Sequence, residues 1–121
     1  MHQRINKREL GNDKEKIAAK YLTGCGYQIL ETNYYCKAGE IDIVAEEDGY
    51  LCFIEVKFRA DEASGFPEEA VDRRKASRIT RSALFYMNEN GYAEDTPCRF
   101  DVVAILGDET MLIKNAFDAA L

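Results

Sequence analysis

The sequence contains one histidine, no closely paired cysteines and no long apolar run, and each absence excludes a class of protein. The single histidine, His2, lies near the terminus, which argues against Cys–His or Ser–His–Asp catalysis. None of the four cysteines forms a C-x-x-C pair, so neither a zinc ribbon nor a dithiol redox motif is present. We therefore expect reduced, structural thiols.

The chain also lacks an apolar run of the roughly 18 residues that a membrane span needs, and an apolar segment typical of a signal peptide. We therefore expect a cytoplasmic protein that does not associate with membranes. Its 121 residues, 46% hydrophobic and 31% charged, are typical of a globular chain. They predict a single domain spanning 1–121.

The charge is unevenly distributed along the sequence. With 16 basic and 22 acidic residues the formal net charge is −6, which counts against a nucleic-acid partner. However, residues 1–20 carry six basic against three acidic groups, and residues 72–81 carry five against one. Two basic regions on an acidic protein permit, but do not require, a polyanion at one face.

The spacing of the apolar residues predicts an α/β sandwich around a central mixed sheet, in the order α-β-β-β-α-β-β. The first helix is expected at 9–23, with Leu10, Ile17, Ala18, Tyr21 and Leu22 on its buried stripe. The second is expected to begin at Pro67 and reach about Asn88. The strands are expected within 27–35, 40–46, 51–59, 99–106 and 111–114.

Asp48 and Gly49 predict a two-residue hairpin turn between the second and third strands. Cross-strand partners then have numbers that sum to 97. Ile43 faces Ile54 and Ile41 faces Val56 on an apolar face that also holds Ala45, Cys52 and Phe58. On the other face Asp42 lies opposite Glu55, and Glu40 lies opposite Lys57.

Two carboxylates directly opposite each other on a sheet destabilise it unless a cation lies between them. Mg²⁺ prefers oxygen ligands of this kind, and Lys57 would stand beside it on the same face. The ammonium could stabilise a phosphate oxyanion or help to position and deprotonate an attacking water. The alternative is that Asp42 and Glu55 are solvated residues on an open face of the sheet.

The run GEIDIVAEEDGYLCFIEVKFR at 39–59 resembles the active-site hairpin of the restriction-endonuclease-like PD-(D/E)xK nucleases, with Asp42, Glu55 and Lys57 at the motif positions. Ile41 stands where the motif has proline, a departure also found in the archaeal Holliday-junction-resolvase-like branch. GN-x2-E-x2-A at 11–18, GEIDIVA, F-x-EVK-x-R and RFDVV at 99–103 resemble the YraN-type family of small bacterial proteins. This resemblance covers nearly the whole chain and implies a restriction-endonuclease-like fold.

The resemblance also implies that an acid of the first helix lies near the metal. Glu15 is the candidate, because in helical projection it falls near the edge of the apolar stripe, and no charged residue lies three or four positions away to pair with it. A lone solvated glutamate is the alternative.

Basic residues form the candidate nucleic-acid contacts. Arg59 continues the polar face of the third strand, where it could contact phosphate or pair with a neighbouring acid. Arg74, Arg78 and Arg81 share one sector of the second helix, which suits backbone phosphates but also a solvated face. Lys75 falls on the inward side, where it could snorkel or reach the site.

Asp101 opens an apolar strand, and we expect it to cap or orient a basic neighbour rather than to bind metal. Tyr34, Tyr35 and Tyr86 are expected to pack in the core, although Tyr35 could instead stack on a base.

The leading hypothesis is an endonuclease that uses Mg²⁺ or Mn²⁺ to hydrolyse phosphodiester bonds in DNA, branched or otherwise structured DNA included. Asp42 and Glu55 would hold the metal with help from Glu15, and Lys57 would support the attacking water. The resolvase resemblance suggests a homodimer. The alternatives are a catalytically inactive nucleic-acid-binding or scaffold protein that keeps the nuclease fold, and a small structural partner protein.

Overall fold

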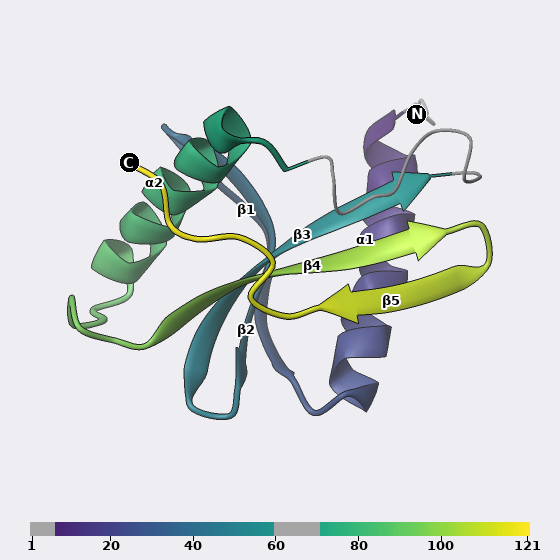
Figure 1. Ribbon diagram of the computed structural model, residues 1–121, viewed down its shortest axis with the longest axis horizontal. Helices are drawn as coiled ribbons and strands as arrows, with labels where there is room; N and C mark the ends of the chain where they lie inside the picture. The colour runs from purple at the N-terminus through teal and green to yellow at the C-terminus, as the bar shows by residue number, and fades with distance from the viewer. Residues whose placement is uncertain (1–6, 60–70) are drawn as a thin grey trace, which may run out of the picture.

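The fold has the predicted order of helices and strands (Figure 1). The computed structural model describes residues 7–59 and 71–121, with side chains described from residue 13 onward. Its elements are α1 (Lys7–Gly24), β1 (Gln28–Cys36), β2 (Gly39–Glu47), β3 (Tyr50–Arg59), α2 (Arg73–Glu89), β4 (Cys98–Leu106) and β5 (Glu109–Ile113). All four cysteines are free, as expected for structural thiols.

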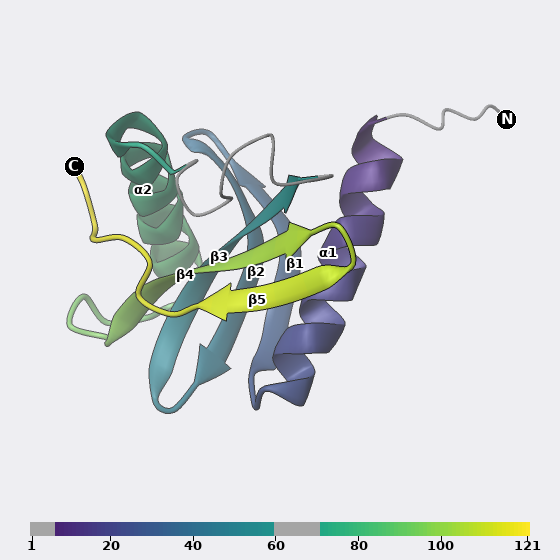
Figure 2. The same ribbon diagram turned by 45° about the vertical axis from the view of Figure 1, so that its right-hand side comes forward.

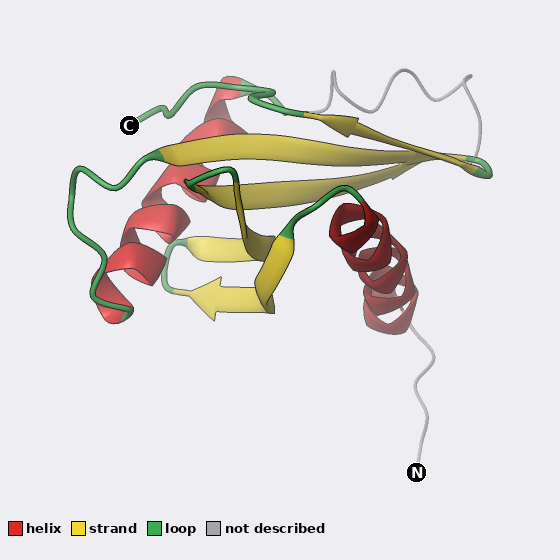
Figure 3. Cartoon of the chain, turned by 90° about the horizontal axis from the view of Figure 1, so that it is seen from below, coloured by secondary structure: helices red, strands yellow, loops and turns green. Residues whose placement is uncertain are grey.

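The five strands form one mixed sheet in the spatial order β1-β2-β3-β4-β5. Only β3 and β4 are parallel, and the connection between them contains α2; the other neighbours are antiparallel. The two helices lie on opposite faces of the sheet (Figures 2 and 3). The protein is therefore an α/β sandwich with one helix on each face, as the sequence predicts.

Helix α1 covers its face of the sheet with a narrower apolar stripe than predicted. Ala18 and Leu22 are fully buried against a cluster that includes Ile43 and Ile54. Ile17 and Tyr21, which were expected on the same stripe, are 45% and 36% exposed. The expectation was wrong for these two residues because α1 meets the sheet along one line of side chains rather than over a broad face.

Helix α2 begins later than predicted. The expected start, Pro67, lies outside the described residues, and within them the helix begins at Arg73. Asp72 caps it: its side chain accepts a hydrogen bond from the Lys75 amide at 2.9 Å. Buried residues then recur every three or four positions along the helix: Ala76, Ile79, Thr80, Ser82, Ala83, Tyr86 and Met87.

Neither α1 nor α2, the helices among the described residues, is long and apolar enough to cross a membrane.

The β2–β3 hairpin has the predicted turn and, close to it, the predicted register. Asp48 and Gly49 both have positive φ, 53° and 82°, as a two-residue turn that matches the strand twist requires. The paired residues run from Glu47 opposite Tyr50 to Ile43 opposite Ile54.

Beyond Ile43 and Ile54 the sheet forks. The outer part of β2 stays paired with β1, as in Tyr34 opposite Ile41, whereas the outer part of β3 stays paired with β4. The two arms diverge in Figure 1. The expected pairs Asp42–Glu55, Ile41–Val56 and Glu40–Lys57 all lie beyond the branch point, and the β2–β3 ladder does not include them.

The fork arises because the two arms pack on different helices. Ile41 and Tyr34 belong to the cluster under α2, whereas Val56 packs against the cluster under α1. Ile41 therefore does not share a face with Ile43 and Val56, and the expected strict alternation along β2 was wrong at this residue. The strand therefore changes the face that it presents to each helix between Ile41 and Ile43, at Asp42.

Candidate metal centre

Asp42 marks the branch point of the fork. Its Oδ2 accepts a hydrogen bond of 2.8 Å from the backbone N–H of Val56 on the opposite arm. The carboxylate thus satisfies an amide for which the β2–β3 ladder provides no partner. Asp42 is held in place by the backbone of the neighbouring strand, which fixes where its second oxygen points.

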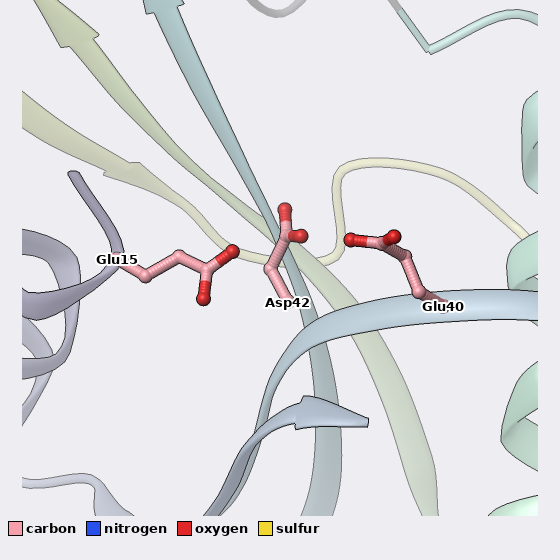
Figure 4. Close-up of side chains that lie close together, drawn as sticks. All are labelled: Glu15, Glu40 and Asp42. Atoms are coloured by element: carbon pink, nitrogen blue, oxygen red, sulfur yellow. The ribbon is translucent and has the colours of Figure 1, made fainter. Parts of the chain in front are cut away.

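Two further carboxylates converge on Asp42. Glu15 comes from α1 and Glu40 from β2, and one oxygen of each of the three lies within 4.8 Å of the others (Figure 4). Glu15 is only 9% exposed, and its Oε1 is buried without a hydrogen-bond partner. A buried oxygen of this kind normally has a partner. The cluster is therefore suited to bind a cation, which would give Glu15 that partner.

The electrostatics of the cluster also favour a cation. Burial, followed by the charge of Glu55, raises the pKa of Asp42 to about 8. Burial is likewise the main cause that raises the pKa of Glu15, and the charge of Glu40 adds to it. Asp42 and Glu15 resist simultaneous ionisation because both are partly or fully shielded from water and like charges are close. A divalent ion would remove this penalty.

Glu55 lies beside the cluster and is neutralised by lysines. Its Oε2 is 2.6 Å from Lys75 Nζ of α2 and 3.4 Å from Lys57 Nζ of its own strand. Burial and the nearby Lys75 lower the pKa of Lys57. For Lys75 burial is the largest single cause and lowers the pKa, but the charge and hydrogen bond of Glu55, together with Lys57 and Asp42, outweigh it, so the pKa is raised. The structure thus places predicted residues Asp42, Glu55, Lys57 and Lys75 together, with Glu55 paired to the two lysines.

Two cavities open onto this group. One, of about 590 Å³, reaches from α1 to Arg59; the other, of about 420 Å³, reaches toward α2 and Arg78. Both are lined by the same four charged side chains, which lie between them: Glu40, Asp42, Glu55 and Lys75. An extended ligand could therefore pass over the carboxylates from one cavity to the other.

The other predicted contacts lie around these cavities. Arg59 lines the first cavity, and its Nη1 donates to the carbonyl of Phe58 at 2.9 Å. Arg74, Arg78 and Arg81 are exposed on α2, and Arg78 lines the second cavity. Tyr35 lines it too and is 52% exposed. The expectation of a packed Tyr35 was wrong, because Tyr34 takes the buried position and successive side chains of a strand point to opposite faces.

Tyr34 and Tyr86 are buried and meet edge to face, as expected of core residues.

Asp101 is fully buried and has the expected structural role. Its oxygens accept hydrogen bonds from Arg99, from the Tyr27 hydroxyl at 2.7 Å and from the Asn115 amide at 2.8 Å. These bonds leave Asp101 no role in the carboxylate cluster.

Sequence reasoning missed Glu40 as a ligand. The register of the hairpin placed it opposite Lys57, on the same polar face as Asp42. A signal was available in the E-x-D spacing, because residues two apart in a strand share a face. The fork removes Lys57 from that position and leaves Glu40 beside Asp42 and Glu15.

Comparison with known proteins identifies relatives along nearly the whole chain. The family described as "Uncharacterised protein family UPF0102" matches residues 14–105. A UPF0102 protein of Lachnoclostridium phytofermentans is 56% identical over 115 residues, which cover 95% of this chain and 98% of the relative. UPF0102 proteins of Fusobacterium nucleatum and Moorella thermoacetica are 45% and 43% identical, and the matches cover 92% and 93% of this chain and 92% and 98% of those proteins.

Proposed function

The chain belongs to the uncharacterised protein family UPF0102, the YraN-type family, and we propose that it is a divalent-metal-dependent endonuclease that hydrolyses phosphodiester bonds in DNA. The observation that carries the proposal is the convergence of Glu15, Glu40 and Asp42, with one buried oxygen lacking a partner, beside two lysines. Carboxylates that bind a metal next to ammonium groups that bind phosphate are suited to phosphoryl chemistry.

The donor set fits Mg²⁺ or Mn²⁺. All three groups offer carboxylate oxygen, which hard cations prefer, whereas the described cluster contains neither thiolate nor imidazole. Glu15, Glu40 and Asp42 would hold the ion, and Glu55 lines the same two cavities as Glu40 and Asp42. When bound, such an ion polarises a phosphoryl oxygen and lowers the pKa of a coordinated water.

The lysines would bind and orient the substrate. Lys57 Nζ and Lys75 Nζ both contact Oε2 of Glu55, and both lysines line the larger cavity. Ammonium groups in a partly buried site stabilise the negative charge that develops on a phosphate in the transition state. Burial keeps Lys57 in place, since its side chain is only 13% exposed.

The polyanion would approach along α2. Arg74, Arg78 and Arg81 form an exposed basic face there, and Arg78 connects that face to the second cavity. Contacts of this type neutralise backbone phosphates without reading sequence. DNA of any sequence, in an extended or branched form, is therefore the proposed substrate class.

One observation favours a second candidate, a nucleic-acid-binding protein without turnover. Glu55 is already neutralised by Lys57 and Lys75 and is not part of the three-carboxylate cluster. A site that keeps this arrangement when DNA binds would hold DNA without cleaving it.

The test is a cleavage assay with labelled duplex, single-stranded, flap and four-way-junction DNA and with RNA, in Mg²⁺, Mn²⁺ or EDTA. We expect metal-dependent cleavage of DNA that is lost in Lys57→Ala and Asp42→Asn. Lys20→Ala, which removes an exposed lysine of α1, is the matched control and should cleave normally. Binding without cleavage by the unaltered protein would favour the second candidate, and cleavage that persists in EDTA would refute the metal site.

A further inference from the structure

Charges at the fork are distributed unevenly. Two ammonium groups, of Lys57 and Lys75, share a single oxygen of Glu55. Among the residues that the structure describes, no lysine or arginine forms an ion pair with Glu15, Glu40 or Asp42. The cations thus gather on the one carboxylate that lies just outside the three-carboxylate cluster.

Lys75 is the most exposed member of this group. Its side chain is 28% exposed, against 13% for Lys57 and 9% for Glu55. It extends from α2, whereas Glu55 and Lys57 are fixed two residues apart on β3. Lys75 also lines both cavities, and Arg78, one turn further along α2, lines one of them. A lysine with a long flexible stem can move from Glu55 to a phosphate placed there.

Lys75 and a divalent cation compete for Glu55. Both would bind the same carboxylate, and two cations on one oxygen repel each other strongly in a partly buried site. While Lys75 stays on Glu55, this fourth carboxylate is not available to a metal held by Glu15, Glu40 and Asp42. A phosphate that attracts Lys75 would release it.

We propose that Lys75 is a movable counterion that withholds Glu55 from the metal until a DNA phosphate binds, so that metal and DNA bind cooperatively. This inference rests on the proposed function and deepens it, because it makes Lys75 a positioning residue for the metal as well as a phosphate contact. By linkage, DNA must then raise the affinity for the metal by the same factor by which the metal raises the affinity for DNA.

The first measurement is Mn²⁺ affinity by calorimetry without DNA. Lys75→Met removes the closer of the two cations on Glu55 and is expected to bind Mn²⁺ at least tenfold more tightly than the unaltered protein. Arg73→Met removes the same charge from an exposed position of the same helix that lines neither cavity, and it should change the affinity less than threefold. Lys75→Gln is the second variant, to be used if Lys75→Met does not unfold cooperatively. Equal affinities in the Lys75 and Arg73 variants would overturn the proposal.

The second measurement is the affinity for a short fluorescent duplex with phosphorothioate linkages, with and without Mn²⁺, by fluorescence anisotropy. The ratio of the two Kd values is expected to be tenfold or more in the unaltered protein and in Arg73→Met. In Lys75→Met it should fall at least fivefold. If the ratio of Kd values is the same in Lys75→Met as in the unaltered protein, and the unaltered protein binds Mn²⁺ and cleaves DNA, the proposed role of Lys75 is refuted while the proposed function stands. Absence of Mn²⁺ binding with and without DNA would refute the proposed function as well.

Discussion

Replacing Asp42 by asparagine should stabilise the metal-free protein. Asparagine keeps the size of the side chain and a carbonyl oxygen that can accept the hydrogen bond from the Val56 amide. It removes a group whose ionisation is opposed by Glu15, Glu40 and Glu55. Its amide can also donate to Glu15, whose Oε1 lacks a partner. Every local consequence of the substitution therefore favours the folded state without metal.

The size and pH dependence of this effect follow from the pKa of Asp42. Folding raises it from 3.8 to about 8. The penalty for ionisation is therefore absent below pH 3.8, grows as the pH rises between the two values, and is constant above the folded-state pKa. Each pH unit above 3.8 adds about 1.4 kcal/mol to the penalty, so at pH 7 the penalty is at most about 4 kcal/mol. Asp42→Asn should recover part of this amount at pH 7 and almost none at pH 4.

Urea unfolding of both proteins between pH 4 and pH 8, with EDTA or with Mn²⁺, measures this directly. The unaltered protein should gain stability from Mn²⁺, because the ion binds the folded state, and the variant should lose most of that gain. Asp95→Asn, at an exposed loop position, is the matched control and should leave both the stability and the Mn²⁺ response unchanged. A metal-free Asp42→Asn protein that is less stable at pH 7, or an equal Mn²⁺ response, would refute the role of Asp42 in a metal site.

Three further predictions test the surrounding residues. Glu15→Gln should lower the increase in Tm that Mn²⁺ produces, as measured by calorimetry; an unchanged increase would exclude Glu15 as a ligand. Asp101→Ala should destabilise the protein by about 3–5 kcal/mol in urea unfolding, because it removes one of the two acidic partners of Arg99 and leaves the Tyr27 hydroxyl and the Asn115 amide without their acceptor; a loss below about 1 kcal/mol would contradict the structural role. Replacing Arg74, Arg78 and Arg81 by alanine should weaken DNA binding at every sequence and reduce the salt slope by up to about three; an unchanged slope would assign them to a solvated face.

The fold was predictable because its signals are local. The alternation of apolar residues identifies the strands, and Asp48–Gly49 fixes both the turn and the register of the five residue pairs next to it. The start of α2 was predicted less well. Proline is typical of a first helical turn, which favoured Pro67 in the sequence, whereas the described helix follows Asp72, whose side chain caps it.

The site was only partly predictable, because it forms where the alternation of side chains along β2 breaks down. Alternation assigned Ile41 to the same face as Ile43, and nothing nearby in the sequence shows that packing under α2 turns it away. That turn ends the ladder, so Glu40 joins Asp42 rather than facing Lys57. The contact between Lys75 and Glu55 links residues twenty positions apart on different elements, and no spacing rule predicts it.

The fork also explains how the protein can hold like charges together. Beyond the branch point the β1–β2 arm packs under α2 and the β3–β4 arm packs over α1, so each arm is anchored by its own apolar cluster. The charged contacts run the opposite way: Glu15 of α1 reaches Asp42 on the arm under α2, whereas Lys75 of α2 reaches Glu55 on the arm over α1. Apolar burial on both faces opposes the repulsion that would otherwise push the arms apart. A cation bound between the arms would replace that repulsion by attraction, and a site made from both arms is therefore sensitive to whatever cation or phosphate enters it.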